Sequence, residues 1–434
     1  DRSLLGYSNT WRRERHTVPL SDRPGRASAG GAEAAEGEGM MTMLNERQEA
    51  VFRGYDDGLI EFARELVRVR SYSGEEEGVA RLVEAKMKEL GYDEVFIDAV
   101  GNVMGRVGDG PRSVLFDSHM DTVEVKDEGE WSLPPFGAEI RDGRLYGRGS
   151  VDMKSSLAAS VYAAAAARDL GLYEGRTVFV TATVSEEYCD GVNLRMLFAE
   201  TGLRPDLVVI CEPSDNLVTL GHKGKAQLLL RTHGVSAHGS APEKGVNAVY
   251  EMAEIITRVE KLNEDLASFG PPHGTIVLSD ISCVSASLNA VPSECSIYLD
   301  RRLVPGETEE DVKREMDALT VGKRASWEIG ILRRKSWTGV ELVYTPLHEA
   351  WEIDRGHELV KACDRAHEKL FGRKPERYGF WDFGTNAVTP VSMGIPTIGF
   401  GPGDYKLAHR VNENCEVDSI LEAFRFYGTL IGEV

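Results

Sequence analysis

Apolar residues recur at the spacing of a helix in three segments of the chain, 47–69, 76–90 and 155–170. Short and almost continuously apolar runs alternate with these segments, at 113–117, 176–184, 206–211 and 396–400. Such runs between helices are typical of parallel strands that are buried on both faces. The pattern therefore predicts a layered α/β domain.

The middle of the chain has a different pattern. Strand-like and helix-like segments follow each other there in the order βαββαβ, at 225–232, 245–262, 275–285, 294–303, 308–319 and 325–332. This order forms a compact, ferredoxin-like unit by itself. We therefore expect an inserted domain at 224–338, within a larger α/β domain whose two parts are 44–223 and 339–434.

Residues 1–43 have few apolar positions and no period, so we expect them to form a disordered N-terminal extension. Their arginines are typical of an import peptide, but the apolar core of a secretory signal is missing. Asp1 is not an initiator, whereas Met40, Met41 and Met43 come just before the first predicted helix. We interpret the extension as a start-site artefact or as a remnant of cloning.

The composition narrows the class of protein. Fifty Lys and Arg stand against seventy Asp and Glu, giving a net charge of −20, which argues against nucleic acid or a membrane as a partner. The longest apolar run, 157–167, is far shorter than the roughly 20 residues that a membrane span needs. Six cysteines without a C-x-x-C motif indicate reduced, mostly buried thiols and a cytoplasmic protein.

Acidic and imidazole side chains follow the ends of the predicted strands: His119 and Asp121, then Glu186 and Glu187, then Glu212, and finally His409. Asp152 stands at the start of the Ala-rich helix 155–170. Open α/β sheets bind ligands beyond the carboxyl ends of their strands. We therefore expect these groups to meet at one edge of the sheet.

A cluster of carboxylates needs a cation to offset its repulsion. Two histidines with several carboxylates and no cysteine suit one or two divalent transition ions, with zinc as the default and cobalt or manganese as alternatives. Each signal alone has a simpler interpretation, since an H-x-D pair is often structural and an E-E pair is often a solvated helix start. Their combination at successive strand ends predicts a metal site.

Six motifs in a fixed order carry a resemblance to a known family: DSHMDTV (117–123), GRGSVDMK (147–154), SEE (185–187), CEPS (211–214), GVSAHGSAPEKGVNA (234–248) and GPGDYKLAH (401–409). The series resembles the dinuclear-zinc aminoacylase superfamily, which includes acetylornithine deacetylase, succinyl-diaminopimelate desuccinylase and related dipeptidases. It is most similar to the branch described as a selenium-metabolism-linked hydrolase, although no residue shows selenium chemistry. The resemblance implies a zinc-peptidase-like catalytic domain and an inserted domain that serves as a lid and as a dimerisation surface.

The resemblance also implies a set of metal ligands. His119 and Glu212 would bind one ion, Glu187 and His409 the other, and Asp152 would bridge them. The peptide bond after Asp152 is often cis in this family. Glu212 stands where many relatives have Asp, and either residue can bind a metal.

Three further residues have implied roles in catalysis. Glu186 would be the general base, and Asp121 would orient His119 through its other ring nitrogen. His238 would stabilise the oxyanion, reaching the site from the partner subunit of a homodimer after domain closure. A histidine among glycines and a proline can also simply line a turn.

The resemblance places substrate contacts at five positions: Asn289, Arg302, Gly401, Gly403 and Thr385. Arg302 suits a carboxylate because its planar fork donates two parallel hydrogen bonds. Its simpler interpretation is a surface salt bridge. Arg301, its neighbour on the strand, is expected to point to the opposite face.

Together these features predict a metal-dependent hydrolase of amide bonds, in which a metal-activated water attacks and Glu186 transfers the proton. The first choice of substrate is an N-acyl amino acid with a free carboxylate. A di- or tripeptide is the alternative, because the sequence does not reveal an anchor for a free α-amino group. A metal-dependent binding protein without turnover is the rival from another class.

Overall fold

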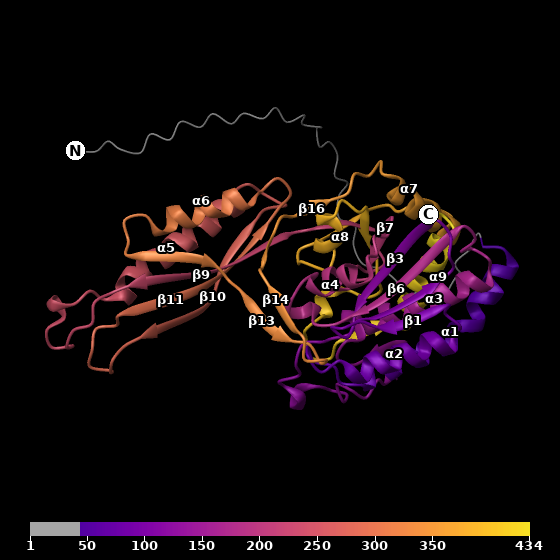
Figure 1. Ribbon diagram of the computed structural model, residues 1–434, viewed down its shortest axis with the longest axis horizontal. Coiled ribbons are helices and arrows are strands. Elements are labelled where there is room, and N and C mark those ends of the chain that lie inside the picture. Colours follow the sequence, from indigo (N-terminus) through magenta and orange to yellow (C-terminus); the bar gives the residue numbers. More distant parts are fainter. Residues whose placement is uncertain (1–43) are drawn as a thin grey trace, which may run out of the picture. The chain divides into compact units, whose positions relative to one another are not determined.

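The computed structural model describes residues 44–434, so the expectations for residues 1–43 lie outside the described part (Figure 1). The larger of its sheets contains nine strands: β1 (Glu94–Ile97), β2 (Val103–Val107), β6 (Arg176–Thr183), β3 (Arg112–His119), β7 (Leu207–Ile210), β18 (Thr397–Gly399), β8 (Thr219–His222) and β16 (Trp351–Glu352) in this spatial order, with β17 (Gly379–Trp381) beside β8. β3 runs parallel to both β6 and β7, and β18 runs parallel to β7. The four predicted strands are confirmed, and their carboxyl ends share one edge.

Helices cover both faces of this sheet. One face packs against α1 (Glu46–Arg68), α2 (Glu77–Glu89), α3 (Ser155–Asp169), α7 (Glu358–Phe371) and α9 (Val417–Ile431). The other packs against α4 (Val192–Thr201) and α8 (Val388–Ser392). Along β3, Val114 and Phe116 lie in the first core, whereas Leu115 lies in the second. This burial of both faces explains why the strands read as continuous apolar runs.

A smaller antiparallel sheet has the spatial order β10 (Thr275–Val284), β11 (Glu294–Leu303), β9 (Gly224–His233) and β12 (Ala325–Ile329), and β15 (Leu347–His348) also pairs with β9. The helices α5 (Ala248–Ala267) and α6 (Glu309–Thr320) pack on one face around a separate apolar core. The predicted βαββαβ order is confirmed. The domain boundaries at 224 and 338 stay predictions, and β15 joins this sheet from beyond the second of them.

Short elements complete the described chain. They are the strands β4 (Ile140–Arg141), β5 (Arg144–Tyr146), β13 (Leu332–Lys335), β14 (Glu341–Tyr344) and β19 (Asn414–Glu416), and single helical turns at Glu128–Glu130, Ser150–Lys154, Glu186–Tyr188, Pro242–Lys244 and Tyr405–Leu407. Within 44–434, no helix is both long enough and apolar enough to cross a bilayer. All six cysteines are free, and all except Cys283 are buried.

Candidate metal centre

The shared edge of the large sheet brings together the side chains that the sequence places after its strands. His119 is the last residue of β3, and the turn Glu186–Tyr188 follows β6. Glu212 comes two residues after β7, His409 lies in the segment after β18, and Asp152 lies in the turn before α3. Parallel pairing of the strands thus converts positions far apart in the chain into one cluster.

Asp152 lies between the two histidines. Its Oδ1 is 2.9 Å from Nε2 of His119, and its Oδ2 is 3.2 Å from Nε2 of His409. Glu212 Oε1 lies 3.7 Å from the same nitrogen of His119, and Glu187 Oε2 lies 3.1 Å from that of His409. The cluster therefore consists of two histidine–carboxylate pairs with one shared carboxylate. The peptide bond between Asp152 and Met153 is cis.

The donor atoms of this cluster fit divalent metal ions. In one group, His119, Glu186 and Glu212 each offer an atom, and these atoms lie within 4.8 Å of one another; His119, Asp152 and Glu187 form a second such group. Oε1 of Glu186 is buried and has no hydrogen-bond partner among residues 44–434. Nitrogen and oxygen donors in this arrangement suit zinc and similar ions.

The pKa shifts of the residues in the cluster indicate that a positive charge would stabilise it. Burial, with the nearby Glu212 carboxylate, raises the pKa of Glu186 well above its usual value, and burial likewise raises the pKa of Glu212 and Glu187. Hydrogen bonds to Asp152 and Glu187 raise the pKa of His409 to about 11. Burial alone would lower the pKa of His119, but Glu212 and Asp152 raise it. Each of these shifts favours the form of the group that reduces the net negative charge of the cluster.

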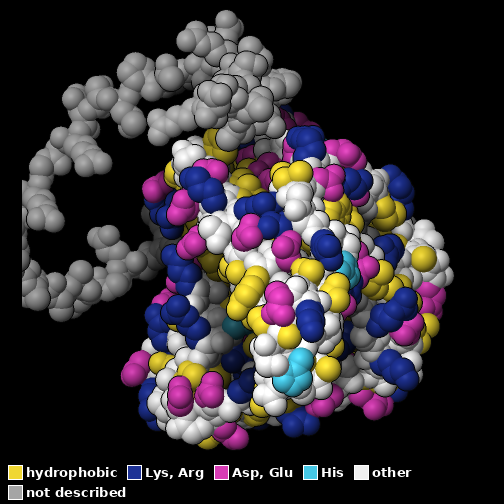
Figure 2. Space-filling view, turned by 90° about the vertical axis from the view of Figure 1, so that its left-hand side faces the viewer, with side chains coloured by type: hydrophobic (Ala, Val, Ile, Leu, Met, Phe, Trp, Pro, Cys, Tyr) yellow, Lys and Arg dark blue, Asp and Glu magenta, His cyan; other side chains and the backbone are white. Residues whose placement is uncertain are grey.

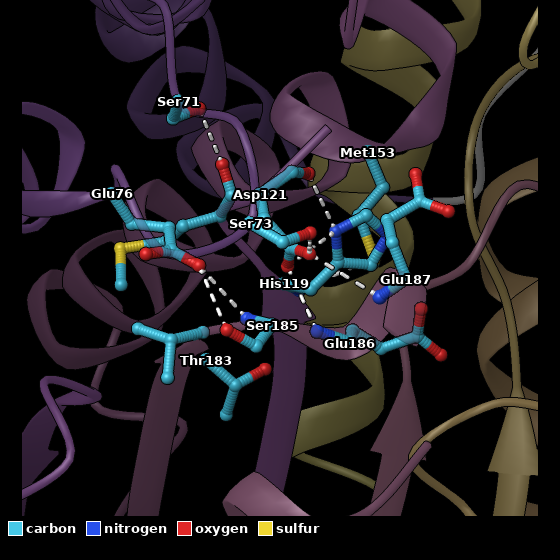
Figure 3. Close-up of polar contacts among 12 residues, drawn as sticks. Ser71, Ser73, Glu76, His119, Asp121, Met153, Thr183, Ser185, Glu186 and Glu187 are labelled. Atoms are coloured by element: carbon cyan, nitrogen blue, oxygen red, sulfur yellow. Dashed lines mark hydrogen bonds and ion pairs between the residues drawn. The ribbon is translucent and has the colours of Figure 1, made fainter. Parts of the chain in front are cut away.

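Asp121 contacts the other ring nitrogen of His119 through its main chain, and its orienting role stays a prediction. Nδ1 of His119 lies 2.9 Å from the main-chain oxygen of Asp121 and 3.6 Å from its carboxylate. The carboxylate instead accepts hydrogen bonds from the backbone N–H groups of Glu186 and Glu187, at 3.0 and 3.2 Å, and from the hydroxyl of Ser73 (Figure 3). Asp121 therefore connects the end of β3 with the Glu186–Tyr188 turn. Its main-chain oxygen contacts His119, and its carboxylate binds the backbone of the turn.

Glu76 supports the same turn from the start of α2, and sequence reasoning missed it. Its Oε1 accepts hydrogen bonds from the backbone N–H and the hydroxyl of Ser185, at 3.0 and 3.1 Å (Figure 3). Burial and the neighbouring Asp121 carboxylate raise the pKa of Glu76 to about 7. Its only sequence signal is an acidic run before an amphipathic helix, which is usually a solvated helix start.

Glu413 holds the loop that carries Asp152, and it too was missed. It is fully buried, and its Oε1 accepts hydrogen bonds from the backbone N–H groups of Val151 and Asp152, at 2.9 and 3.1 Å. Its Oε2 forms an ion pair with the buried Arg148 at 2.5 Å. Because Glu413 is four residues from His409, one short segment supports both sides of the cluster.

A cavity of about 280 Å³ opens beside the cluster. Its wall includes Glu186, Glu212 and His409 from the large sheet and Lys225 and Arg302 from the small one. Arg302, predicted to recognise substrate, is thus at the cavity, where Asp300 pairs with it at 2.6 Å. Arg301 points away, as expected: it is fully buried and pairs with Glu307 and Glu315.

His238 and Asn289 are not brought to the cavity within one chain. Both are exposed, on segments that contact each other through a bridge between His238 and Ala290. Nδ1 of His238 lies 2.7 Å from the hydroxyl of Ser240. They belong to the region of the small sheet and α5, whose surface mixes acidic, basic and apolar side chains (Figure 2). The role predicted for His238 requires a second subunit, and the roles of both residues stay predictions.

Gly401, Gly403 and Thr385 are buried, and their predicted substrate contacts stay predictions. The N–H of Gly401 donates to the hydroxyl of Ser214, and that of Gly403 donates to the hydroxyl of Ser419. The hydroxyl of Thr385 accepts from the backbone N–H of Ala387. These three groups therefore have hydrogen-bond partners inside the protein, and Phe383 and Gly384 line the cavity.

Residues 115–433 match the family described as peptidase family M20/M25/M40. The chain belongs to this family. It is therefore a metallohydrolase that acts on amide or peptide bonds, as the order of the motifs predicted. The match spans the strand ends and both histidines of the cluster.

Individual relatives agree with this assignment. The uncharacterised protein YgeY of Escherichia coli K12 is 36% identical over 384 residues, which cover 87% of this chain and 94% of that protein. An acetylornithine deacetylase of Edwardsiella ictaluri is 31% identical over 328 residues, covering 74% and 80%. A tripeptidase of Staphylococcus aureus has a similar fold, with a TM-score of 0.68, 20% identity and coverage of 87% and 98%. The selenium-linked branch stays a prediction.

Proposed function

We propose that this enzyme holds two divalent ions and removes the acyl group from an N-acyl amino acid. His119 with Glu212 and Glu187 with His409 are the two ligand pairs, and Asp152 is the shared ligand. Zinc is the default ion for these donors. Such a pair of ions supplies an activated water and polarises the amide carbonyl.

Glu186 is the residue of this chain that transfers the proton during the reaction. Its carboxyl is buried at the cavity, its backbone N–H is fixed by Asp121, and its Oε1 has no partner within the described protein. This carboxyl takes a proton from the attacking water and passes it to the leaving amine, which must depart neutral. A carboxyl that is placed beside the ligands but fully bonded would instead be structural. The free Oε1 is the observation that carries the proposal.

The acidic residues that line the cavity favour a deacylase over a dipeptidase. A dipeptide has a free α-amino group, which needs an acidic or metal-linked anchor, whereas an acyl chain does not. Among the acids that line the cavity, Asp190 is the one outside the proposed metal and proton-transfer roles, and Lys225 Nζ pairs with it at 2.6 Å. The acetylornithine deacetylase relatives support the same choice. A di- or tripeptide is the second candidate.

The remaining parts of the proposal concern assembly and location. A homodimer would bring His238 of the partner subunit to the cavity, where it would stabilise the oxyanion. Six free thiols favour a reducing, cytoplasmic compartment.

The test is the release of free amine from N-acetyl, N-succinyl and N-formyl amino acids and from dipeptides. Wild-type protein is assayed with zinc, cobalt or manganese, beside the Glu186→Ala variant. We expect release from acyl amino acids and none from the variant. Release from dipeptides alone would replace the first candidate by the second, and release that persists in the variant would refute the role of Glu186.

A further inference from the structure

Two cations stand side by side on the small sheet where it faces the cavity. In the register of β9 and β11, Lys225 is directly opposite Arg302. Residues directly opposite in an antiparallel pair point to the same face. Both line the cavity, and the side chain of Lys225 is only 12% exposed.

This pairing is unfavourable for the fold alone, because like charges directly opposite each other repel. Each cation is held by one acid: Asp190 lies 2.6 Å from Nζ of Lys225, and Asp300 lies 2.6 Å from Nε of Arg302. These contacts leave donors free, since an ammonium has three N–H groups and a guanidinium has five. The pair is thus fixed in position and still able to bind an anion.

The same cavity is also lined by Glu186 and by the proposed metal ligands, which come from the large sheet and its loops. An amide substrate whose carbonyl lies at the ligands would place its other end toward the two cations. We infer that Lys225 is a specificity-determining residue, which together with Arg302 clamps a carboxylate of the substrate. The inference rests on the proposed function and adds to it a second cation that the sequence motifs do not mark.

Lys225 also has a structural role that the test must separate. Asp190 is buried, and Lys225 is the main charge that keeps its pKa low. The same carboxylate accepts a hydrogen bond from Tyr344 at 3.1 Å. Removing Lys225 alone would leave this buried carboxylate without its main counter-charge, which destabilises a protein strongly. The variant therefore combines Lys225→Met with Asp190→Asn, which removes both charges.

The binding test compares succinate with its uncharged diamide, succinamide, by calorimetry on zinc-loaded protein. We expect wild-type protein to bind succinate more tightly, and the double variant to lose about 10- to 100-fold in succinate affinity, the loss typical of one hydrogen bond to a charged group. Succinamide binding should not change. Lys223→Met is the matched control, because Lys223 is 13% exposed, pairs with Asp382 and does not line the cavity. Equal succinate affinity in the double variant and the wild type would overturn the inference.

The kinetic test uses the N-acetyl amino acid and its carboxamide. In the double variant we expect KM for the acid to rise about 10- to 100-fold while kcat changes little, and the carboxamide to be cleaved as by the wild type. Lys225→Arg should keep the preference for the acid. If wild-type protein cleaves no amide but succinate binding still depends on Lys225, the proposed function fails and the clamp stands. An acid-to-carboxamide ratio that the double variant leaves unchanged would refute the clamp alone.

Discussion

The edge of the large sheet and the outer part of the small sheet differ in whether their predicted site residues find contact partners within one chain. At the edge, His119 and Glu212 are 1% and 4% exposed, and each has its partners in the same chain. On the small sheet, the predicted site residues His238 and Asn289 are exposed and contact none of the cluster. His119 and Glu212 are therefore held in position by side chains of the same chain. The predicted roles of His238 and Asn289 would need a substrate or a second subunit to complete the site.

Removal of the metal ions should have the largest effect, and it should be confined to the large sheet. Without cations the buried carboxylates repel one another, so we expect turnover to fall to background and the melting temperature to drop. Hydrogen exchange should accelerate in the Glu186–Tyr188 turn and remain unchanged in β9 and β11. Added zinc should restore all three. Exchange that accelerates equally in both sheets would remove the distinction between them.

Arg301 and Arg302 are neighbours on β11, and we expect one of them to act on stability and the other on substrate binding. Arg301→Ala leaves Glu307 and Glu315 without their buried partner, and we expect a loss of about 3–5 kcal/mol in the free energy of unfolding. Arg302→Ala should cost less than about 1 kcal/mol and raise KM instead. Urea unfolding and steady-state kinetics measure the two effects. If Arg301→Ala raises KM and Arg302→Ala causes the larger loss of stability, then Arg301 and not Arg302 contacts the substrate carboxylate.

His238 tests whether a partner subunit completes the cavity. His238→Ala should lower kcat by about 10²- to 10³-fold, as the loss of an oxyanion donor does, and leave the metal content unchanged. When this variant is mixed and refolded with Glu186→Ala, hybrid dimers combine one intact base with one intact histidine. We therefore expect the mixture to regain activity. Hybrids that form without any gain in activity would contradict a contribution from the partner.

Glu413 should have a smaller effect on the large sheet. Glu413→Gln removes the charge that pairs with Arg148 and supports the Asp152 loop, so we expect metal binding to weaken by about 10- to 100-fold. Glu416→Gln is the control, because Glu416 is exposed and pairs with Arg144. Competition with a chelator of known affinity measures the change. Equal metal affinity in both variants would mean that Glu413 does not support the ligand.

The sequence predicted most of what strand order determines. The apolar runs located β3, β6, β7 and β18, and residues just after parallel strands must meet at one edge, so the cluster followed. Asp152 was found through its motif, and the predicted cis peptide is present.

The sequence could not supply contacts that depend on packing between distant segments. Glu76 and Glu413 are ordinary acids in the pattern, and only the folded chain brings them to Ser185 and to the Asp152 loop. Lys225 reads as the start of a strand, and its place opposite Arg302 depends on the register of β9 and β11. The use of the Gly401 and Gly403 amides inside the protein is likewise a tertiary feature.

The most direct test of the account is to measure metal content and turnover on the same preparation of Glu186→Gln. The substitution keeps the shape of the side chain and removes its ability to take a proton. We expect two metal ions per chain in both proteins, an unchanged melting temperature and a fall in kcat of about 10²- to 10⁴-fold in the variant. A variant that keeps its turnover, or one that loses activity only because it has lost a metal ion, would contradict the role of Glu186 as the general base.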